Sequence, residues 1–311
     1  MKNYGGHDTI MYSLRASELS SAAGSSAERP KMETPAGVRV RQIEESDTDA
    51  VVALLSLGFS DRTPDYWRKA MARLKARHLP GDYPRYGYAL TDKGVVTGVL
   101  LLIFSRTDTG DIRANVSSWY VEPKYRLFSN MLLAQALRMP DVTFVNVSPA
   151  PHTLQTIGQQ GFVPYVGGTF VALAALGKPR RGAKIGEVAP YDGEDASIIQ
   201  RQAALGCLSY EVTFEGQSYL FAFLPRTDRS TGIRFAQLVY CRDIADFACL
   251  AGPLGRHLLR RGYLFVILDA NGPIKGLLGH YLAGRKVKCS RGPAQPRLGD
   301  LTETELVLFG P

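Results

Sequence analysis

The sequence has 311 residues, which gives room for two domains of ordinary size, and its 45% hydrophobic and 21% charged residues are typical of a soluble globular protein. The longest apolar run, Val95 to Phe104, is too short for a transmembrane helix, which needs about 20 residues. The N-terminus lacks the pattern of a secretory signal, so we expect a cytoplasmic protein without membrane association. The formal net charge of +8 indicates anionic partners without identifying them.

Residues 1–36 are rich in Ser, Ala and Gly and have no apolar periodicity, so we expect a disordered tail. Beyond it, alternating apolar residues indicate strands, and capping residues followed by an apolar stripe indicate helices. The elements expected next are a strand at residues 38–43, helices from 46 and from 63, strands at 86–90, at 95–104 and up to 121, a helix at 129–138, a strand at 142–147, a helix at 152–160 and strands at 163–165 and 169–173.

Residues 178–184 are polar and basic and contain Gly and Pro, which predicts a linker. The elements expected after it are a strand at 185–188, a helix at 193–205, strands at 208–214, 219–224 and 233–241, a helix at 247–261, a strand at 265–269, a helix at 274–282 and a strand at 303–309. All four cysteines fall in this half without a CxxC pair or a zinc-ligand spacing, so we expect free thiols and no metal site.

The chain repeats one order of elements about 120 residues apart. Each copy has a polar Arg-Thr-Asp turn (from Arg106 or Arg226), an apolar strand that ends at Tyr120 or Tyr240, then a helix and a buried strand. A repeat of this length predicts two copies of one domain rather than a solenoid. We therefore expect an α+β fold with domains at 37–177 and 185–311, each with antiparallel strands followed by a β-α-β unit whose parallel pair is buried.

The first copy carries a motif between its central strand and the next helix, Val121-Glu122-Pro123-Lys124-Tyr125-Arg126, and its later helix ends in Gly161-Phe162. With the order of elements, this motif resembles the GNAT superfamily of acyl-CoA N-acyltransferases, whose loop reads V-x-P-x-(Y/F)-(R/Q)-x-x-G-x-(G/A). Ser129 and Met131 stand in place of its glycine and its last small residue. The resemblance implies two tandem GNAT-like domains, the second degenerate, each with a mixed, mainly antiparallel sheet, a β-α-β cofactor unit and flanking helices.

The resemblance implies acetyl-CoA or another acyl-CoA as the cofactor. A helix N-terminus presents unpaired N–H groups and a partial positive charge, which suit a pyrophosphate. The residues that we expect to bind the cofactor are Tyr120 and Val121 near the thioester, and Arg126, Leu127, Phe128, Ser129 and Asn130 at the pyrophosphate. On a purely structural interpretation, Arg126 is a surface charge and Ser129 caps the helix.

Acyl transfer to an amine needs a base for the ammonium proton and an acid for the leaving thiolate. The resemblance implies a central-strand glutamate as the base, here Glu122, and a tyrosine four residues before Gly161, where this chain has Ile157. His152 is the second catalytic candidate, and Ser148 or Tyr165 are alternatives to it. As structural residues, Glu122 would be a solvated side chain and His152 a polar helix cap.

The second copy has Arg242-Asp243-Ile244-Ala245-Asp246 at the corresponding loop, where two carboxylates would repel a phosphate. We therefore expect the first copy to hold the cofactor, and the second to form a wall of the acceptor pocket.

These expectations describe an acyl-CoA-dependent N-acyltransferase, most simply an acetyltransferase, that acts on a small-molecule or peptide amine in a cleft between the copies. The sequence does not fix the oligomeric state. The alternative is a noncatalytic GNAT-like binding or regulatory protein that has lost the tyrosine and the loop glycines. A nucleic-acid-associated protein is a third option, which the sequence favours least because it has no helix-turn-helix or zinc-finger pattern.

Overall fold

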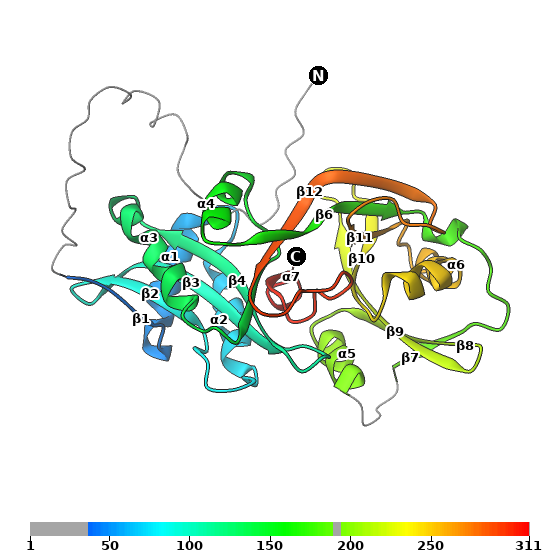
Figure 1. Ribbon diagram of the computed structural model, residues 1–311, viewed down its shortest axis with the longest axis horizontal. Coiled ribbons are helices and arrows are strands. Elements are labelled where there is room, and N and C mark those ends of the chain that lie inside the picture. Colours follow the sequence, from blue (N-terminus) through cyan, green and yellow to red (C-terminus); the bar gives the residue numbers. More distant parts are fainter. Residues whose placement is uncertain (1–36, 189–193, 311) are drawn as a thin grey trace, which may run out of the picture. The chain divides into compact units, whose positions relative to one another are not determined.

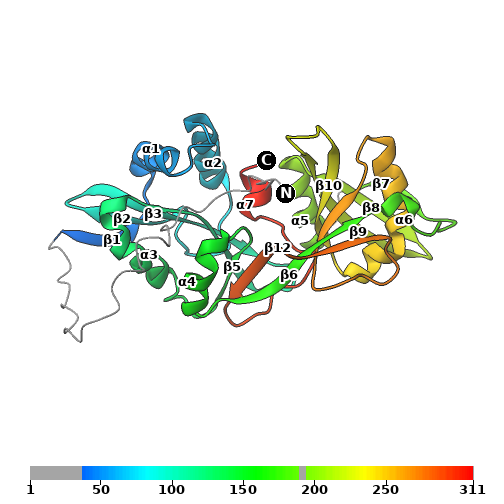
Figure 2. The same cartoon turned by 90° about the horizontal axis from the view of Figure 1, so that it is seen from above.

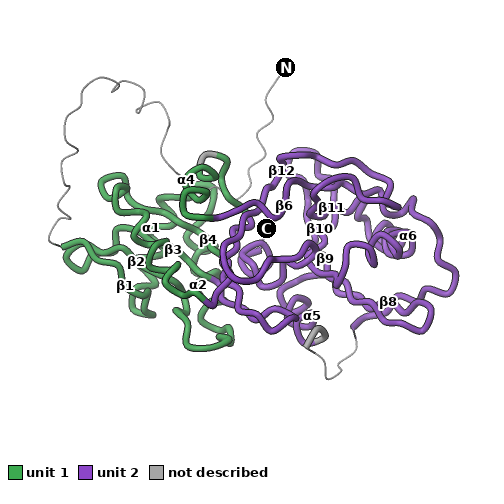
Figure 3. The backbone as a smooth tube through the Cα atoms, in the orientation of Figure 1, with its two compact units in different colours: residues 1–102, 116–140, 148–161 green, residues 103–115, 141–147, 162–311 purple. Residues whose placement is uncertain are grey.

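The computed structural model describes residues 37–188 and 194–310 (Figure 1). The tail expected at residues 1–36 lies outside the described residues. The chain separates into two compact units that alternate along the sequence (Figure 3). Unit 1 comprises residues 1–102, 116–140 and 148–161, and unit 2 comprises residues 103–115, 141–147 and 162–311.

The division between the units does not fall at residues 178–184, where the sequence predicts a linker. It runs instead through β3 (Val95–Arg106) and β4 (Ile112–Val121), and each of these strands contributes to both units. Arg180, inside the predicted linker, donates a hydrogen bond from Nε to the Cys249 carbonyl (3.0 Å), so this segment is bonded to the rest of unit 2, to which it belongs. The arrangement as two copies of one domain stays a prediction from the sequence.

Unit 1 combines antiparallel strands with helices on both faces. Its elements are β1 (Val38–Gln42), η2 (Glu45–Asp47), α1 (Thr48–Gly58), α2 (Pro64–Ala76), β2 (Gly87–Asp92), parts of β3 and β4, η3 (Pro123–Phe128), α3 (Ser129–Ala136), η4 (Pro151–Thr153) and α4 (Leu154–Gln159), where η denotes a 3-10 helix. β1 pairs with β2, and β2 with β3, both antiparallel. Figure 2 shows α1 and α2 on one face of these strands, and α3 and α4 on the other.

Helix α2 begins where the sequence predicts, and for the expected reason. The Thr63 side chain accepts the N–H of Tyr66, and Pro64 fills the first helical position, where no N–H is needed. Trp67 and Leu74, seven residues apart on the apolar stripe of this helix, are at most 1% exposed, so the apolar face of the helix is the buried face.

Unit 2 contains most of the strands. Its elements are parts of β3 and β4, β5 (Val142–Asn146), β6 (Val163–Ala172), η5 (Ala174–Leu176), β7 (Lys184–Glu187), α5 (Glu194–Ala204), β8 (Leu208–Phe214), β9 (Gln217–Thr227), β10 (Arg234–Cys241), α6 (Ile244–Arg260), β11 (Val266–Ala270), β12 (Gly279–Arg291) and α7 (Glu305–Leu308). The strand order is β5-β12-β6-β11-β10-β9-β8-β7. β10 and β11 are parallel, as are β4 and β5, and the other neighbours are antiparallel.

Two elements near the C-terminus differ from the sequence prediction. Residues 279–291 form the strand β12 instead of continuing a helix, because they pair with β6. The two strands approach so closely at Gly279 that a Cβ there would lie 2.1 Å from the Val171 carbonyl oxygen. Residues 305–308 form the short helix α7 instead of a strand. The side-chain oxygen of Asn115 accepts the Glu305 N–H (2.7 Å), which satisfies a donor that a strand partner would otherwise take.

The strands predicted at 163–165 and 169–173 form one continuous strand, β6, and the remaining elements follow the predicted order. Each half contains a β-α-β unit, β4-α3-β5 and β10-α6-β11. The α+β class with a mixed, mainly antiparallel set of strands is thus confirmed. Among residues 37–188 and 194–310, no helix is both long enough and apolar enough to cross a bilayer.

Candidate functional site

The predicted cofactor-binding residues follow the carboxyl end of β4, in unit 1. Here the chain enters η3 and passes directly into α3, so residues 123–136 form one helical run. The N–H of Tyr125 donates to the Glu122 carbonyl (2.9 Å), and the N–H of Ser129 donates to the Arg126 carbonyl. The run therefore begins at Pro123, and Ser129 lies inside it.

This geometry corrects the physical reason for placing a phosphate at Ser129. The sequence predicts a helix that opens near Ser129 and offers unpaired N–H groups, but the N–H of Ser129 is already bonded within the run. Only the first turn of a helix leaves N–H groups without a partner, and here that turn begins with Pro123, which has no N–H. An anion at Ser129 would therefore be held mainly by side chains.

The side chains along the run suit an anion. Lys124 and Asn130 are exposed, and Arg126 and Ser129 are half-buried, so two cations, an amide and a hydroxyl lie within seven residues. This donor set fits a diphosphate, which offers negative charge and many hydrogen-bond acceptors. Sequence reasoning did not include Lys124 among the contacts, although its place in the motif beside Arg126 gave the signal. Phe128 is half-buried, and Leu127 is 72% exposed.

Tyr125, the aromatic residue of the motif, fixes the run to the strands. Its hydroxyl donates to Asp92 Oδ2 (2.8 Å), and its ring is 8% exposed. Asp92 is the last residue of β2, at the turn into β3. Tyr125 therefore holds η3 in place, and the residues of the motif that are available to contact a ligand are its neighbours.

The backbone at the carboxyl end of β4 has a defined orientation. The N–H of Glu122 donates to the Thr97 carbonyl on β3 (2.9 Å). Because consecutive residues of a strand direct their N–H groups to opposite edges, the N–H of Val121 points away from β3. The Val121 side chain is buried against β3, where a Cβ at Gly98 would lie 2.8 Å from it. Val121 can therefore serve a ligand through its backbone.

Tyr120 lies on the opposite side of the strand from Val121. A Cβ added at Gly58 would lie 2.4 Å from the Tyr120 ring, so the ring packs closely against the last residue of α1. Tyr120 remains partly exposed. Its position next to a glycine means that a bulkier residue at position 58 would displace the ring.

The parallel pairing of β4 with β5 is short. It joins Ile112–Asn115 to residues 142–145, after which β4 continues to Val121 whereas β5 ends at Asn146. Ligands of sheets with parallel strands bind outside the carboxyl ends of those strands. The end of β4 is the corresponding place in this chain.

The catalytic candidates have different outcomes. Glu122 is partly exposed and precedes η3 without a side-chain bond to it. His152 lies in η4, but its side chain is outside the described part of the structure, so its catalytic role stays a prediction. Tyr165, one of the alternatives, is packed in the core of unit 2, where burial raises the pKa of its hydroxyl. Ile157, at the tyrosine position, is 2% exposed.

The loop of the second copy uses its acids to stabilise a helix. The Asp243 side chain accepts the N–H of Ala245 (2.8 Å) and caps α6, and Asp246 lies in the first turn. Acidic residues there stabilise the helix through its dipole and fill the place of an anionic ligand.

The strand edge beside that loop is also covered. β10 pairs in parallel with β11 at Ala236 and Gln237. Further along β10, the N–H of Leu301 donates to the Val239 carbonyl (2.8 Å), and the N–H of Cys241 donates to the Gly299 carbonyl (2.9 Å). Residues 299–301 thus take the hydrogen bonds at the carboxyl end of this strand.

Comparison with solved structures gives several acetyltransferases. A GCN5-related N-acetyltransferase from Anabaena variabilis aligns with 82% of this chain and 72% of its own, at a TM-score of 0.56 and 10% sequence identity. A putative acetyltransferase from Pyrococcus horikoshii aligns with 88% of this chain and 95% of its own, at a TM-score of 0.51 and 12% identity. A glucosamine N-acetyltransferase region of a fungal multi-domain GH3 beta-N-acetylglucosaminidase aligns with 83% of this chain and 38% of its own, at a TM-score of 0.52 and 12% identity.

No family model and no curated protein matches the sequence. The chain has the fold of the GCN5-related N-acetyltransferases, as the resemblance implied. A fold supports more than one function, so the activity has to be argued from the site.

Proposed function

We propose that this chain is an N-acyltransferase that moves an acyl group, most simply acetyl, from acyl-CoA to an amine of a small molecule or peptide. The observation that carries the proposal is the donor set at the carboxyl end of β4. Lys124, Arg126, Ser129 and Asn130 lie on a helical run that Tyr125 anchors to β2. Together they would hold the diphosphate of the cofactor, which when bound supplies an activated acyl thioester.

Two residues at the strand end have roles that follow from their positions. The N–H of Val121, which points away from β3, would donate a hydrogen bond to the acyl oxygen and stabilise the charge that develops there. Glu122, the next residue, is partly exposed and would accept the ammonium proton of the acceptor. His152 would hold the proton for the leaving group.

Calorimetric titration with acetyl-CoA tests the binding part of the proposal. The double variant Arg126→Glu/Ser129→Trp reverses one charge and fills the space beside the run, so we expect it to lose binding. Arg138→Glu is the matched control, because Arg138 is exposed and lies beyond the end of α3. Binding that is equal in the wild type and the double variant would remove this site.

Free-thiol release from acetyl-CoA in the presence of a panel of amines tests the transfer. We expect Glu122→Gln to lower kcat at least about tenfold, since general bases contribute about 10²–10⁴-fold, while the Kd for acetyl-CoA stays unchanged. A kcat unchanged in this variant would exclude Glu122 as the base.

A noncatalytic acyl-CoA-binding or regulatory protein is the second candidate, and one observation favours it. The position that holds a tyrosine in the family is Ile157, a buried side chain that cannot donate a proton. Acetyl-CoA binding without thiol release across the panel would support this candidate over the enzyme.

A further inference from the structure

Four strands of unit 2 have their ends in line. Ala236 at the start of β10 lies opposite Val266 of β11. Val266 lies opposite Ala172 of β6, and Ala172 lies opposite Gly279 of β12. Four segments therefore adjoin one end of the sheet: residues 173–178, 228–234, 259–265 and 273–278. They carry six large apolar side chains that are 37–67% exposed, namely Leu173, Leu176, Ile233, Leu259, Leu264 and Leu278.

Backbone hydrogen bonds hold these apolar residues at the end of the sheet. The N–H of Leu173 donates to the Leu278 carbonyl (2.9 Å), and the N–H of Leu176 donates to the Leu173 carbonyl (3.0 Å). The N–H of Leu264 donates to the Arg234 carbonyl (3.0 Å). Single exposed apolar residues are common on protein surfaces, but a group of them at one place marks an interaction surface.

The same end of the sheet has an excess of positive charge. Residues 142–186 and 270–299, which contain β6 and β12, include no Asp or Glu. Asp228 is the one acid in the four segments, and its carboxylate accepts the hydroxyls of Ser230 and Thr231. The exposed cations in these segments are Arg229, Arg234, Arg260, Arg261 and Lys275. The surface therefore combines apolar side chains with cations.

Aromatic rings hold two of the guanidinium groups. The Arg234 guanidinium lies 4.5 Å from the centre of the Tyr263 ring and donates to its hydroxyl (2.8 Å). The Arg261 guanidinium lies 5.4 Å from the centre of the Tyr210 ring. A guanidinium has more N–H donors than these contacts use, so both groups can still bind an anion. Because they are already held, binding costs them less conformational entropy.

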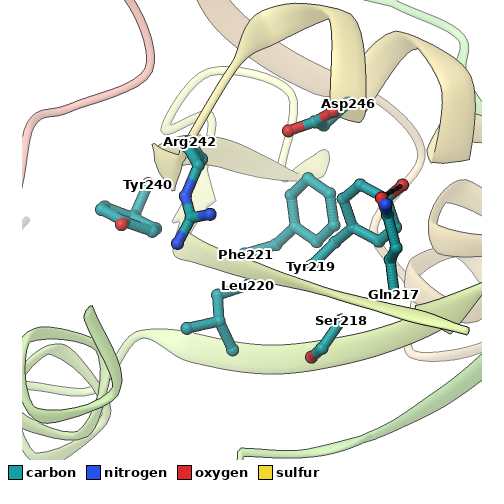
Figure 4. A pocket seen from close by; sticks show the side chains of 8 residues that line it. All are labelled: Gln217, Ser218, Tyr219, Leu220, Phe221, Tyr240, Arg242 and Asp246. Carbon is teal, nitrogen blue, oxygen red and sulfur yellow. Dashed lines mark hydrogen bonds between the residues drawn. The ribbon is translucent and has the colours of Figure 1, made fainter. Parts of the chain in front are cut away.

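The other end of β10 has a different character. The pocket there contains one cation and one anion, Arg242 and Asp246 (Figure 4). The combination of exposed leucines with an excess of cations is therefore a property of the start of β10 and not of its carboxyl end.

We propose that this end of unit 2 binds the surface of a bilayer that contains anionic lipids. The six apolar side chains would enter the interfacial region, and the arginines and Lys275 would contact the lipid phosphates. A second copy of the chain fits this surface less well, because a symmetric interface would place the cations against one another. Nucleic acid would contact the cations and leave the leucines in water.

This proposal departs from the expectation of a protein without membrane association, which was based on the lengths of the apolar runs. Binding to the surface of a bilayer needs no segment that spans it. The proposal is also independent of acyl transfer, because it involves none of the residues of the candidate site.

Sedimentation of the full chain with lipid vesicles tests the proposal. We expect vesicles of phosphatidylcholine mixed with phosphatidylglycerol to bind it at least about tenfold more tightly than phosphatidylcholine alone, and added salt to reduce this difference. No binding to the mixed vesicles, or equal binding to both kinds, would overturn the proposal. A chain that dimerises without lipid or retains duplex DNA, and does not bind the vesicles, would assign the surface to that partner instead.

A pair of leucine substitutions tests the apolar contribution. Leu176→Ser/Leu278→Ser should weaken binding to the mixed vesicles at least about tenfold, because two apolar side chains no longer enter the interface. Leu57→Ser/Val95→Ser is the matched control: these side chains are 71% and 66% exposed, against 67% and 55% for the tested pair, and lie in unit 1. Equal losses in the two variants would contradict the proposed surface.

A pair of charge substitutions tests the cations. Arg260→Gln/Lys275→Gln should weaken binding to the mixed vesicles at low salt at least about tenfold, since each cation near an anionic surface contributes about fivefold. Arg39→Gln/Arg138→Gln removes two exposed cations from unit 1 and should change little. Binding that is unchanged in Arg260→Gln/Lys275→Gln would overturn the proposal. The wild-type vesicle series stays decisive where a variant folds poorly, and a failure of acetyl-CoA binding would not affect it.

Discussion

Replacing Asp300 with asparagine tests a buried ion pair that ties the C-terminal segment of unit 2 to β4. Asp300 Oδ2 lies 2.9 Å from Arg113 Nη1, and the two side chains are 6% and 5% exposed. The other carboxylate oxygen, Oδ1, accepts the N–H (3.1 Å) and the hydroxyl (2.6 Å) of Thr302. Arg113 also donates to the Thr302 carbonyl (2.5 Å), so removing the negative charge leaves a cation buried among neutral acceptors.

The expected cost of Asp300→Asn follows from that burial. Removing one partner of a buried pair costs about 3–5 kcal/mol, because the remaining charge stays desolvated. Asparagine keeps the shape and can still accept one hydrogen bond, so we expect a loss near the lower limit, about 3 kcal/mol in the free energy of unfolding. The apolar double variant Arg113→Met/Asp300→Leu should be less destabilised, since it leaves no unpaired charge.

Urea unfolding followed by circular dichroism measures the difference. Arg201→Gln is the control: Arg201 pairs with Glu303 at 2.6 Å, but its side chain is 52% exposed, so the loss should be below about 1 kcal/mol. A loss for Asp300→Asn as small as that of the control would refute the reasoning, because it would mean that burial does not strengthen the pair.

The same ion pair predicts how the stability of the protein changes at acid pH. Burial alone would raise the pKa of Asp300, but the charges of Arg113 and Arg297 and the hydrogen bonds from Thr302 hold it below its ordinary value. A carboxyl whose pKa is lowered by folding contributes its full stabilisation above its unfolded pKa, about 3.9, and loses it as the pH falls through the lower folded pKa. Asp300→Asn should therefore flatten the acid limb of the stability profile below about pH 4. An unchanged acid limb would contradict the assignment.

Four further predictions follow from particular contacts. Asp228 accepts hydrogen bonds from the Ser230 and Thr231 hydroxyls and N–H groups, which lower its pKa to about 2, so its NMR titration should fall there and move upward in Ser230→Ala. Gly252→Ala should destabilise the chain by about 1–3 kcal/mol in urea unfolding, because the new Cβ would lie 2.1 Å from the Lys178 carbonyl oxygen, whereas Gly186→Ala, with nothing within 4 Å, should change little. Tyr125→Phe removes the bond to Asp92 and should weaken acetyl-CoA in calorimetry if the anchored run holds the diphosphate; equal affinity would show that the anchor is dispensable. The same titration should give one acetyl-CoA per chain, because residues 299–301 occupy the hydrogen bonds at the carboxyl end of β10, where the second copy would bind a cofactor. A stoichiometry of two would contradict this reasoning.

Local signals predicted most of the fold, and long-range pairing explains the exceptions. Helix α2 begins at Thr63-Pro64 as predicted, because the effects of a capping side chain and of a proline at the first position act within one helical turn. The apolar spacing around residues 274–282 matches a helix as well as a strand. From Gly279 onward the residues pair with β6, and this pairing decides for the strand. The alternation at 303–309 likewise suggested a strand, because no local pattern could reveal that Asn115, far along the chain, accepts the Glu305 N–H.

The sequence predicted which segment forms the candidate site, but it did not predict the hydrogen bonds within that segment. The motif from Val121 to Arg126 located the end of β4 and the following helical run. It could not show that η3 continues into α3 and occupies the N–H of Ser129, because that depends on where the helical run begins.

The carboxyl end of β10 is closed by residues outside the loop that leads into α6, so the sequence of that loop alone does not reveal the closure. Gly299 lies against β10 with φ +80°, and a Cβ there would be 2.6 Å from Cys241 Sγ, so glycine is what lets the segment approach the strand. Arg297 donates to the Cys241 carbonyl on one side of Gly299, and Asp300 pairs with Arg113 on the other. A ligand that needed the edge of β10 would have to break these bonds together with the two backbone bonds of residues 299–301. The acids of the α6 loop and this segment therefore act on the same strand end, and restoring a glycine-rich loop alone would not open it.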